Sequence, residues 1–149
     1  PRPDLTVSIG TPNACNQCHQ KPHETPQWAA DKVVEWYGPK RRDDPHYGEI
    51  VHAGRRGDPA AHEQLVGLAK SSQVGPIVRA TAVSLLATRY PNATNDKAIQ
   101  RALKSPQALM RAAALQAFDQ LQITSRHEAS RLHELLTPAR RRPSDLSHS

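Results

Sequence analysis

The stretch VRATAVSLL at residues 78–86 recurs in diverged form as MRAAALQAF at residues 110–118. Three of the nine aligned positions are identical, and several others exchange one apolar side chain for another. A second match, just upstream, pairs Leu65, Leu68 and Ala69 with Ile99, Ala102 and Leu103. The two matches are offset by 32 and 34 residues, and helix pairs that recur at such a spacing are typical of α-solenoids. The repeat therefore predicts a HEAT-like array of about two and a half helix pairs.

The rest of the chain also has helical signals. Proline follows a good N-cap residue at Thr11-Pro12, Thr25-Pro26, Asp44-Pro45, Asp58-Pro59, Ser105-Pro106 and Thr137-Pro138, and such doublets mark helix starts. No run of residues alternates in the manner of a strand. We therefore predict an all-α fold with an extended leader at 1–10, a short helix at 12–19, and helices at 26–37, 45–55 and 126–136.

Composition narrows the range of functions. The 149 residues carry a net charge of +6, only 4% are aromatic, and mean hydropathy is −0.68. No apolar run approaches the ~18 residues of a membrane span. The basic residues are scattered and are not interleaved with aromatic ones, which disfavours nucleic-acid binding. The positive charge instead fits an acidic partner surface.

The two cysteines lie three residues apart, in the run Cys15-Asn16-Gln17-Cys18-His19. Cys-x-x-Cys-His is the attachment signature of c-type haem. One helical turn presents two thiols to the two vinyl groups of the porphyrin, and the next residue brings an imidazole over the iron. We predict one covalent haem c, with Cys15 and Cys18 as thioethers and His19 as the proximal iron ligand.

Other uses of the motif compete with haem. Structural zinc could take Cys15, Cys18 and a pair from His19 and His23, but such sites usually draw their second ligand pair from further along the chain. A thioredoxin-like redox pair needs a βαβ setting, and no strand pattern precedes the motif. Because haem c is attached outside the cytoplasm in bacteria, the haem interpretation predicts a periplasmic or extracellular protein.

Three stretches together resemble a known family: PRPDL at residues 1–5, GTPNACNQCH at 10–19, and the QWAA and EWYG ends of 27–38. The chain is similar to multihaem c-type cytochromes that carry C-terminal HEAT-like or tetratricopeptide repeats. Members usually carry further haem motifs upstream. We therefore expect either a piece of a larger cytochrome or a subunit whose other haems lie on partner chains.

The resemblance implies electron transfer through one haem docked beside other haems. We expect no enzymatic activity, because the chain lacks the features that an enzyme would need. The chain has no nucleophile elbow, paired carboxylates in an apolar setting or phosphate-binding glycine loop. Two alternatives stay open. One is a helical-repeat interaction module with a structural haem, and the other is a haem enzyme or gas sensor with an open iron position.

A second axial ligand is predicted from helix geometry. A helix starting at Pro45 should run back antiparallel to the helix at 26–37, because the loop between them is short. This would bring His52 to the iron and leave His46 as the first alternative. A ligand from another chain is the next alternative. Met110 is expected in the core, because it aligns with Val78.

The remaining predictions concern charge and domain boundaries. The candidate partners for the haem propionates are Arg41, Arg42, Arg55 and Arg56. We place a haem-binding segment at residues 1–57, helical repeats at 58–143 and a mobile tail at 144–149.

Overall fold

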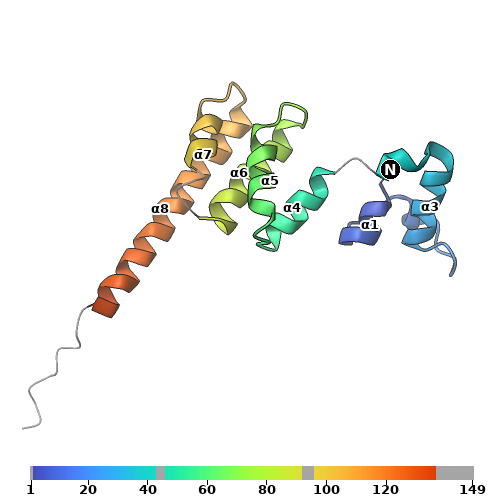
Figure 1. The fold of residues 1–149 in the computed structure, drawn as a ribbon, viewed down its shortest axis with the longest axis horizontal. Helices are drawn as coiled ribbons and strands as arrows, with labels where there is room; N and C mark the ends of the chain where they lie inside the picture. The colour runs from blue at the N-terminus through green and yellow to red at the C-terminus, as the bar shows by residue number, and fades with distance from the viewer. Residues whose placement is uncertain (1, 43–45, 92–95, 137–149) are drawn as a thin grey trace, which may run out of the picture.

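The computed structural model describes residues 2–42, 46–91 and 96–136. This part of the chain is all-α, as predicted, and contains no strand. The elements are α1 (Asp4–Ile9), α2 (Cys15–Cys18), α3 (Pro26–Tyr37), the 3-10 helix η1 (Pro39–Arg42), α4 (Tyr47–Arg55), α5 (Ala61–Lys70), α6 (Pro76–Arg89), α7 (Asp96–Leu103) and α8 (Ala108–Leu136). The molecule is elongated, with α1 to α3 at one end and α8 at the other (Figure 1).

The matched stretches form two helix pairs, α5 with α6 and α7 with α8. The second helices of the two pairs, α6 and α8, pack on each other, and the first helices, α5 and α7, also touch. Helix α4 packs on α6 from the other side of the array. One apolar cluster runs through these helices, and Leu65, Leu86, Ile99 and Met110 are among its fully buried side chains. Met110 is 1% exposed, which confirms its place in the core. This stacking agrees with the internal repeat; its assignment to the HEAT class stays a prediction.

Helix α4 packs with the repeats and not with the helix after the motif. Ile50 and Val51 pack against the apolar cluster of the repeats. A Cβ on Gly54 would lie 2.8 Å from Cδ1 of Leu65, so this glycine lets α4 approach α5 closely. The predicted antiparallel return onto α3 is therefore wrong, because the apolar side of α4 is used against α5 and α6. The predicted haem-binding segment at 1–57 included the residues of α4. By its packing, however, α4 belongs with the repeats.

The C-terminal helix is longer than predicted. The sequence predicted a separate helix at 126–136, but α8 runs without a break from Ala108 to Leu136. Residues 119–126, DQLQITSR, contain no glycine or proline that could end it. The predicted tail at 144–149 and the Thr137-Pro138 helix start lie outside the described residues.

The leader is helical and not extended as predicted. Asp4 lies in the first turn of α1, Leu5 is buried, and Gly10 ends the helix with a φ of 71°. Such a left-handed residue after a helix is the usual role of glycine. Helix α1 packs against α3 and also touches α4, so the leader forms part of the support for the motif.

Helix α3 has the predicted bounds. The Thr25 side chain accepts a hydrogen bond from the Trp28 amide, Pro26 takes the first turn, and Gly38 follows the helix with a φ of 83°. Other doublets do not start helices directly: α2 begins three residues after Pro12, and α5 begins two residues after Pro59.

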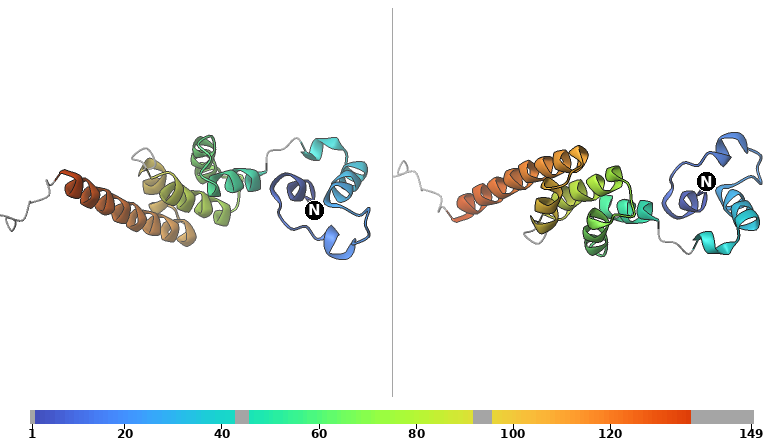
Figure 2. Two further views of the ribbon diagram at one scale, coloured as in Figure 1. Left: turned by 90° about the horizontal axis from the view of Figure 1, so that it is seen from below. Right: turned by 90° about the horizontal axis from the view of Figure 1, so that it is seen from above.

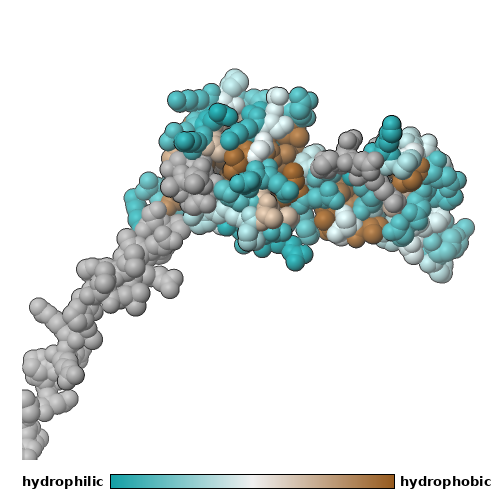
Figure 3. All heavy atoms as spheres, viewed as in Figure 1, coloured by the Kyte–Doolittle hydropathy of each residue, from teal (hydrophilic) through white to brown (hydrophobic). Residues whose placement is uncertain are grey.

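No helix in the described ranges is long and apolar enough to cross a membrane. The face seen in Figure 3 is mostly hydrophilic, with apolar side chains in separate patches. The two further views in Figure 2 also show α1 to α3 grouped at one end of the molecule, with α5 to α8 packed together beyond α4.

Candidate functional site

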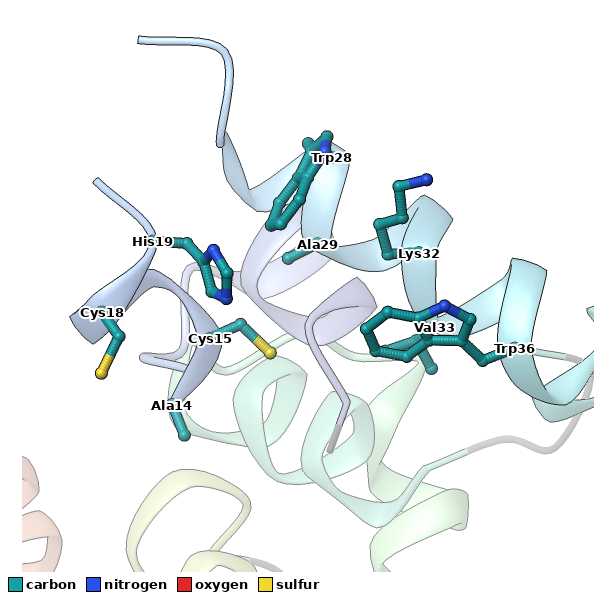
Figure 4. A pocket seen from close by; sticks show the side chains of 9 residues that line it. All are labelled: Ala14, Cys15, Cys18, His19, Trp28, Ala29, Lys32, Val33 and Trp36. Carbon is teal, nitrogen blue, oxygen red and sulfur yellow. The ribbon is translucent and has the colours of Figure 1, made fainter. Parts of the chain in front are cut away.

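The motif lines a pocket between α2 and α3. The pocket has a volume of about 370 Å³, which lies within the range of small-molecule and cofactor sites. Its lining residues are Ala14, Cys15, Cys18, His19, Trp28, Ala29, Lys32, Val33 and Trp36. All three residues predicted for haem attachment thus line one pocket, together with one face of α3 (Figure 4).

The single turn of α2 sets the spacing of the motif. Cys15 and Cys18 are its first and last residues, and the His19 amide donates to the Cys15 carbonyl oxygen at 2.9 Å. Both thiols are free; Cys15 is half-buried and Cys18 is exposed. Figure 4 shows the Cys15 sulfur directed toward the α3 side and the Cys18 sulfur at the outer edge. Two cysteine thiols three residues apart and the histidine that follows them are the groups through which haem c is attached.

The imidazole of His19 is held by a carboxylate. Its Nδ1 lies 3.1 Å from Oε1 of Glu24. An ionised carboxylate only accepts hydrogen bonds, so Nδ1 is the protonated nitrogen when this bond forms. Among the described residues, Nε2 has no hydrogen-bond partner, so Nε2 is the nitrogen that could bind a metal ion.

Glu24 is itself fixed by the backbone. Its Oε2 accepts from the Lys21 amide at 3.0 Å. The Lys21 amide and the His19 side chain, in that order of effect, hold the pKa of Glu24 below its usual value of 4.5. Hydrogen bonds to the ionised form cause this direction of shift.

Two tryptophans and a lysine on α3 complete the pocket. Trp28, Lys32 and Trp36 follow one another at a spacing of four residues, so they lie on one face of the helix. The Trp28 ring lies 5.0 Å from the His19 ring, between centroids, and Lys32 pairs with Glu35 at 2.6 Å. These residues were not among the predicted site residues, although their spacing of four is readable from the sequence.

Asparagines tie the motif to its surroundings. The Asn13 side chain donates to Thr6 Oγ1 at 2.7 Å and to Asn16 Oδ1 at 2.9 Å. Asn16 then donates to the Glu24 carbonyl oxygen at 2.7 Å. This network joins α1, the motif and the loop that carries Glu24.

The structure does not bring the predicted second axial ligands to the pocket. His52 lines a different hollow with Arg56 and Asp58 on the repeat side. His46 caps α4, where its Nδ1 accepts from the Gly48 amide at 3.1 Å, and its ring lies 4.2 Å from that of Tyr47. His52 lies in α4 and His46 caps it, and α4 packs on the repeats. The loop before α4 therefore does not bring either histidine back to the motif, as its short length had predicted.

The predicted propionate partners are also away from the pocket where their side chains are described. Arg55 and Arg56 lie at the C-terminal end of α4, and Arg56 lines the hollow that contains His52. The side chains of Arg41 and Arg42 lie outside the described part of the structure. Lys32 is the cationic side chain in the pocket lining.

Within the described residues, no three His, Cys, Asp or Glu side chains converge as a zinc site would require. A haem would need no such cluster, because the porphyrin itself would supply most of the nitrogens that bind the iron and His19 would supply one from the protein. The residues present therefore fit a covalent haem.

No family model, curated protein or solved structure matches the chain.

Proposed function

We propose that this chain is an electron-transfer c-type cytochrome, or a subunit of one, with a single covalent haem. The observation that carries the proposal is that Cys15, Cys18 and His19 line one pocket beneath an aromatic face of α3. Cys15 and Cys18 would hold the haem through thioethers, in which each thiol adds its sulfur to one carbon of a vinyl group and its proton to the other. When bound, the haem supplies one-electron chemistry by cycling between ferric and ferrous iron.

The residues of the pocket would hold the haem, orient it and shield it from water. Trp28 and Trp36 offer aromatic surfaces to a flat macrocycle, and Ala29 and Val33 form the apolar floor between them. Lys32 places a positive charge at the same pocket, where it can pair with a propionate. Apolar walls restrict water, which influences the reduction potential of a haem.

The surface beside the pocket supports docking to another redox protein. Trp36 and Tyr37 are 66% and 62% exposed, and Lys40 follows them in the chain. Exposed aromatic side chains are enriched in interfaces, and the net charge of +6 favours an acidic partner. We infer that a partner haem protein docks at this end of the molecule, in the periplasm or outside the cell.

A haem enzyme or gas sensor with an open iron position is the second candidate. It is favoured by one observation: His19 is the one imidazole among the described residues that line the pocket. Under the leading proposal, a second histidine of this chain would move to the haem and give a low-spin iron.

An absorption spectrum of the protein in both redox states, after production in cells that attach haem c, tests the proposal. We expect a sharp α-band and a low-spin spectrum. A high-spin spectrum with direct binding of carbon monoxide supports the second candidate. The absence of a Soret band overturns both. His19→Ala should change this spectrum, because His19 is the proposed iron ligand. His62→Ala is the control and should leave the spectrum unchanged, because His62 contacts Tyr90 on the repeat side.

A further inference from the structure

We propose that Glu24 is a positioning residue for His19, which makes the imidazole a more electron-donating iron ligand and lowers the reduction potential. The inference rests on the proposed haem attachment. It concerns a residue outside the Cys-x-x-Cys-His motif, five positions beyond its histidine.

The contact is built from both carboxylate oxygens. Oε1 of Glu24 lies 3.1 Å from Nδ1 of His19, and Oε2 accepts from the Lys21 amide at 3.0 Å. The Glu24 side chain is 11% exposed, compared with 51% for His19. The carboxylate is therefore the sheltered, fixed member of the pair, and it orients the more exposed ring.

The backbone of Glu24 is fixed by the motif itself. Asn16, which lies between the two cysteines, donates to the Glu24 carbonyl oxygen at 2.7 Å. The Glu24 amide donates to the Lys21 carbonyl oxygen at 2.8 Å. Hydrogen bonds of both the side chains and the main chain therefore fix the loop from His19 to Glu24.

Trp28 restricts the ring from another direction. Its centroid lies 5.0 Å from that of His19, with the planes tilted by 47°, and Figure 4 shows the two rings side by side above the Cys15 sulfur. With Nδ1 held by the carboxylate and one ring neighbour in place, Nε2 is presented as the metal-binding nitrogen.

The chemical consequence follows from the charge of the acceptor. A second partner that accepts the free N–H of a metal-bound histidine raises the basicity of the ligand, and an ionised acceptor makes a stronger bond than a neutral one. A more basic imidazole stabilises ferric iron more than ferrous iron. The Glu24 carboxylate should therefore lower the midpoint potential.

The test measures midpoint potentials of the haem-loaded protein and two matched variants. Glu24→Gln keeps the shape of the side chain and removes its charge. Glu35→Gln removes the same charge from α3, where Glu35 pairs with Lys32 of the pocket and no described contact joins it to His19. We expect both variants to keep the α-band, and Glu24→Gln to raise the potential clearly more than Glu35→Gln.

Equal shifts in the two variants, or no shift in Glu24→Gln, would overturn the inference and leave the proposed function standing. A missing α-band in the unaltered protein would instead overturn the proposed function. If Glu24→Gln does not take up haem, Asn16→Ala provides the test. It keeps the carboxylate but frees the Glu24 carbonyl, and a raised potential supports the inference whereas an unchanged one contradicts it.

Discussion

The motif end of the molecule and the helical repeats are stabilised in different ways. From α5 to the first half of α8, apolar side chains form one continuous buried cluster. In α1 to α3 the buried apolar side chains are few and small apart from Leu5 and Val33. There, side-chain hydrogen bonds join Thr6, Asn13 and Asn16 to the loop before α3.

This difference in stabilisation separates the part of the chain that forms an apolar core from the part that carries the Cys-x-x-Cys-His motif. Burial of apolar surface stabilises the repeats without any cofactor. The motif end has little such burial, so helix caps and polar contacts carry a larger share of its stability, and a haem bound there would add to it. Binding of a ligand to the folded state adds stability by mass action. We therefore expect the motif end to respond strongly to haem and the repeats to respond little.

Leu86→Ala should produce the largest loss of stability. Leu86 is fully buried in the cluster, and truncation of such a leucine costs about 2–5 kcal/mol. Chemical denaturation followed by circular dichroism measures the loss. The absorption spectrum of the haem should stay unchanged, because Leu86 lies in the repeats. A shifted spectrum would show that the two regions are coupled.

Thr25→Ala should have a smaller effect, confined to the motif end. The Thr25 hydroxyl accepts from the Trp28 amide at 3.2 Å, and loss of an N-cap costs about 1 kcal/mol. Amides of α3 should then exchange with solvent about five-fold faster. Thr81→Ala is the control, since that hydroxyl donates to the Ile77 carbonyl within α6. Equally faster amide exchange in α3 and in the repeats would contradict the view that the two regions are stabilised separately.

Acid should weaken the motif end through Glu24. Its pKa in the folded protein is lowered from 4.5, so its stabilising effect is complete above about pH 4.5 and is lost as the pH falls through the lower folded value. The difference in unfolding free energy between the unaltered protein and Glu24→Gln should therefore shrink below pH 4.5. If the difference in unfolding free energy grows on acidification, Glu24 does not stabilise the motif end through its ionised form.

His52→Ala should cause the smallest change. His52 lines a hollow on the repeat side and not the motif pocket, so the spin state of the haem should be the same with and without it. The absorption spectra of the oxidised proteins provide the measurement. A change from low spin to high spin would show that α4 leaves the repeats and supplies the second axial ligand.

These regions also differ in how well the sequence predicts them. The bounds of α3 follow from Thr25-Pro26 at its start and Gly38 at its end, and the stacking of α6 on α8 follows from their matched apolar positions. The pocket residues Cys15, Cys18 and His19 follow from the chemistry of the motif. All of these signals are local in the sequence or repeat within it.

The incorrect placement of α4 depended on contacts between elements. Nothing local shows whether α4 packs on α3 or on α5, and the close approach of Gly54 to Leu65 becomes visible only in three dimensions. The helical leader was missed although Gly10 is a good helix-ending residue. Glu24 was missed because a hydrogen bond across a loop has no sequence periodicity.

The proposed function depends on one haem held at the motif end by two thioether bonds. The intact mass of the denatured chain, after production in cells that attach haem c, tests this attachment most directly. We expect the mass of the chain plus one haem, and the bare chain mass for the Cys15→Ala/Cys18→Ala variant. A bare chain mass for the unaltered protein under the same conditions would contradict the proposed attachment.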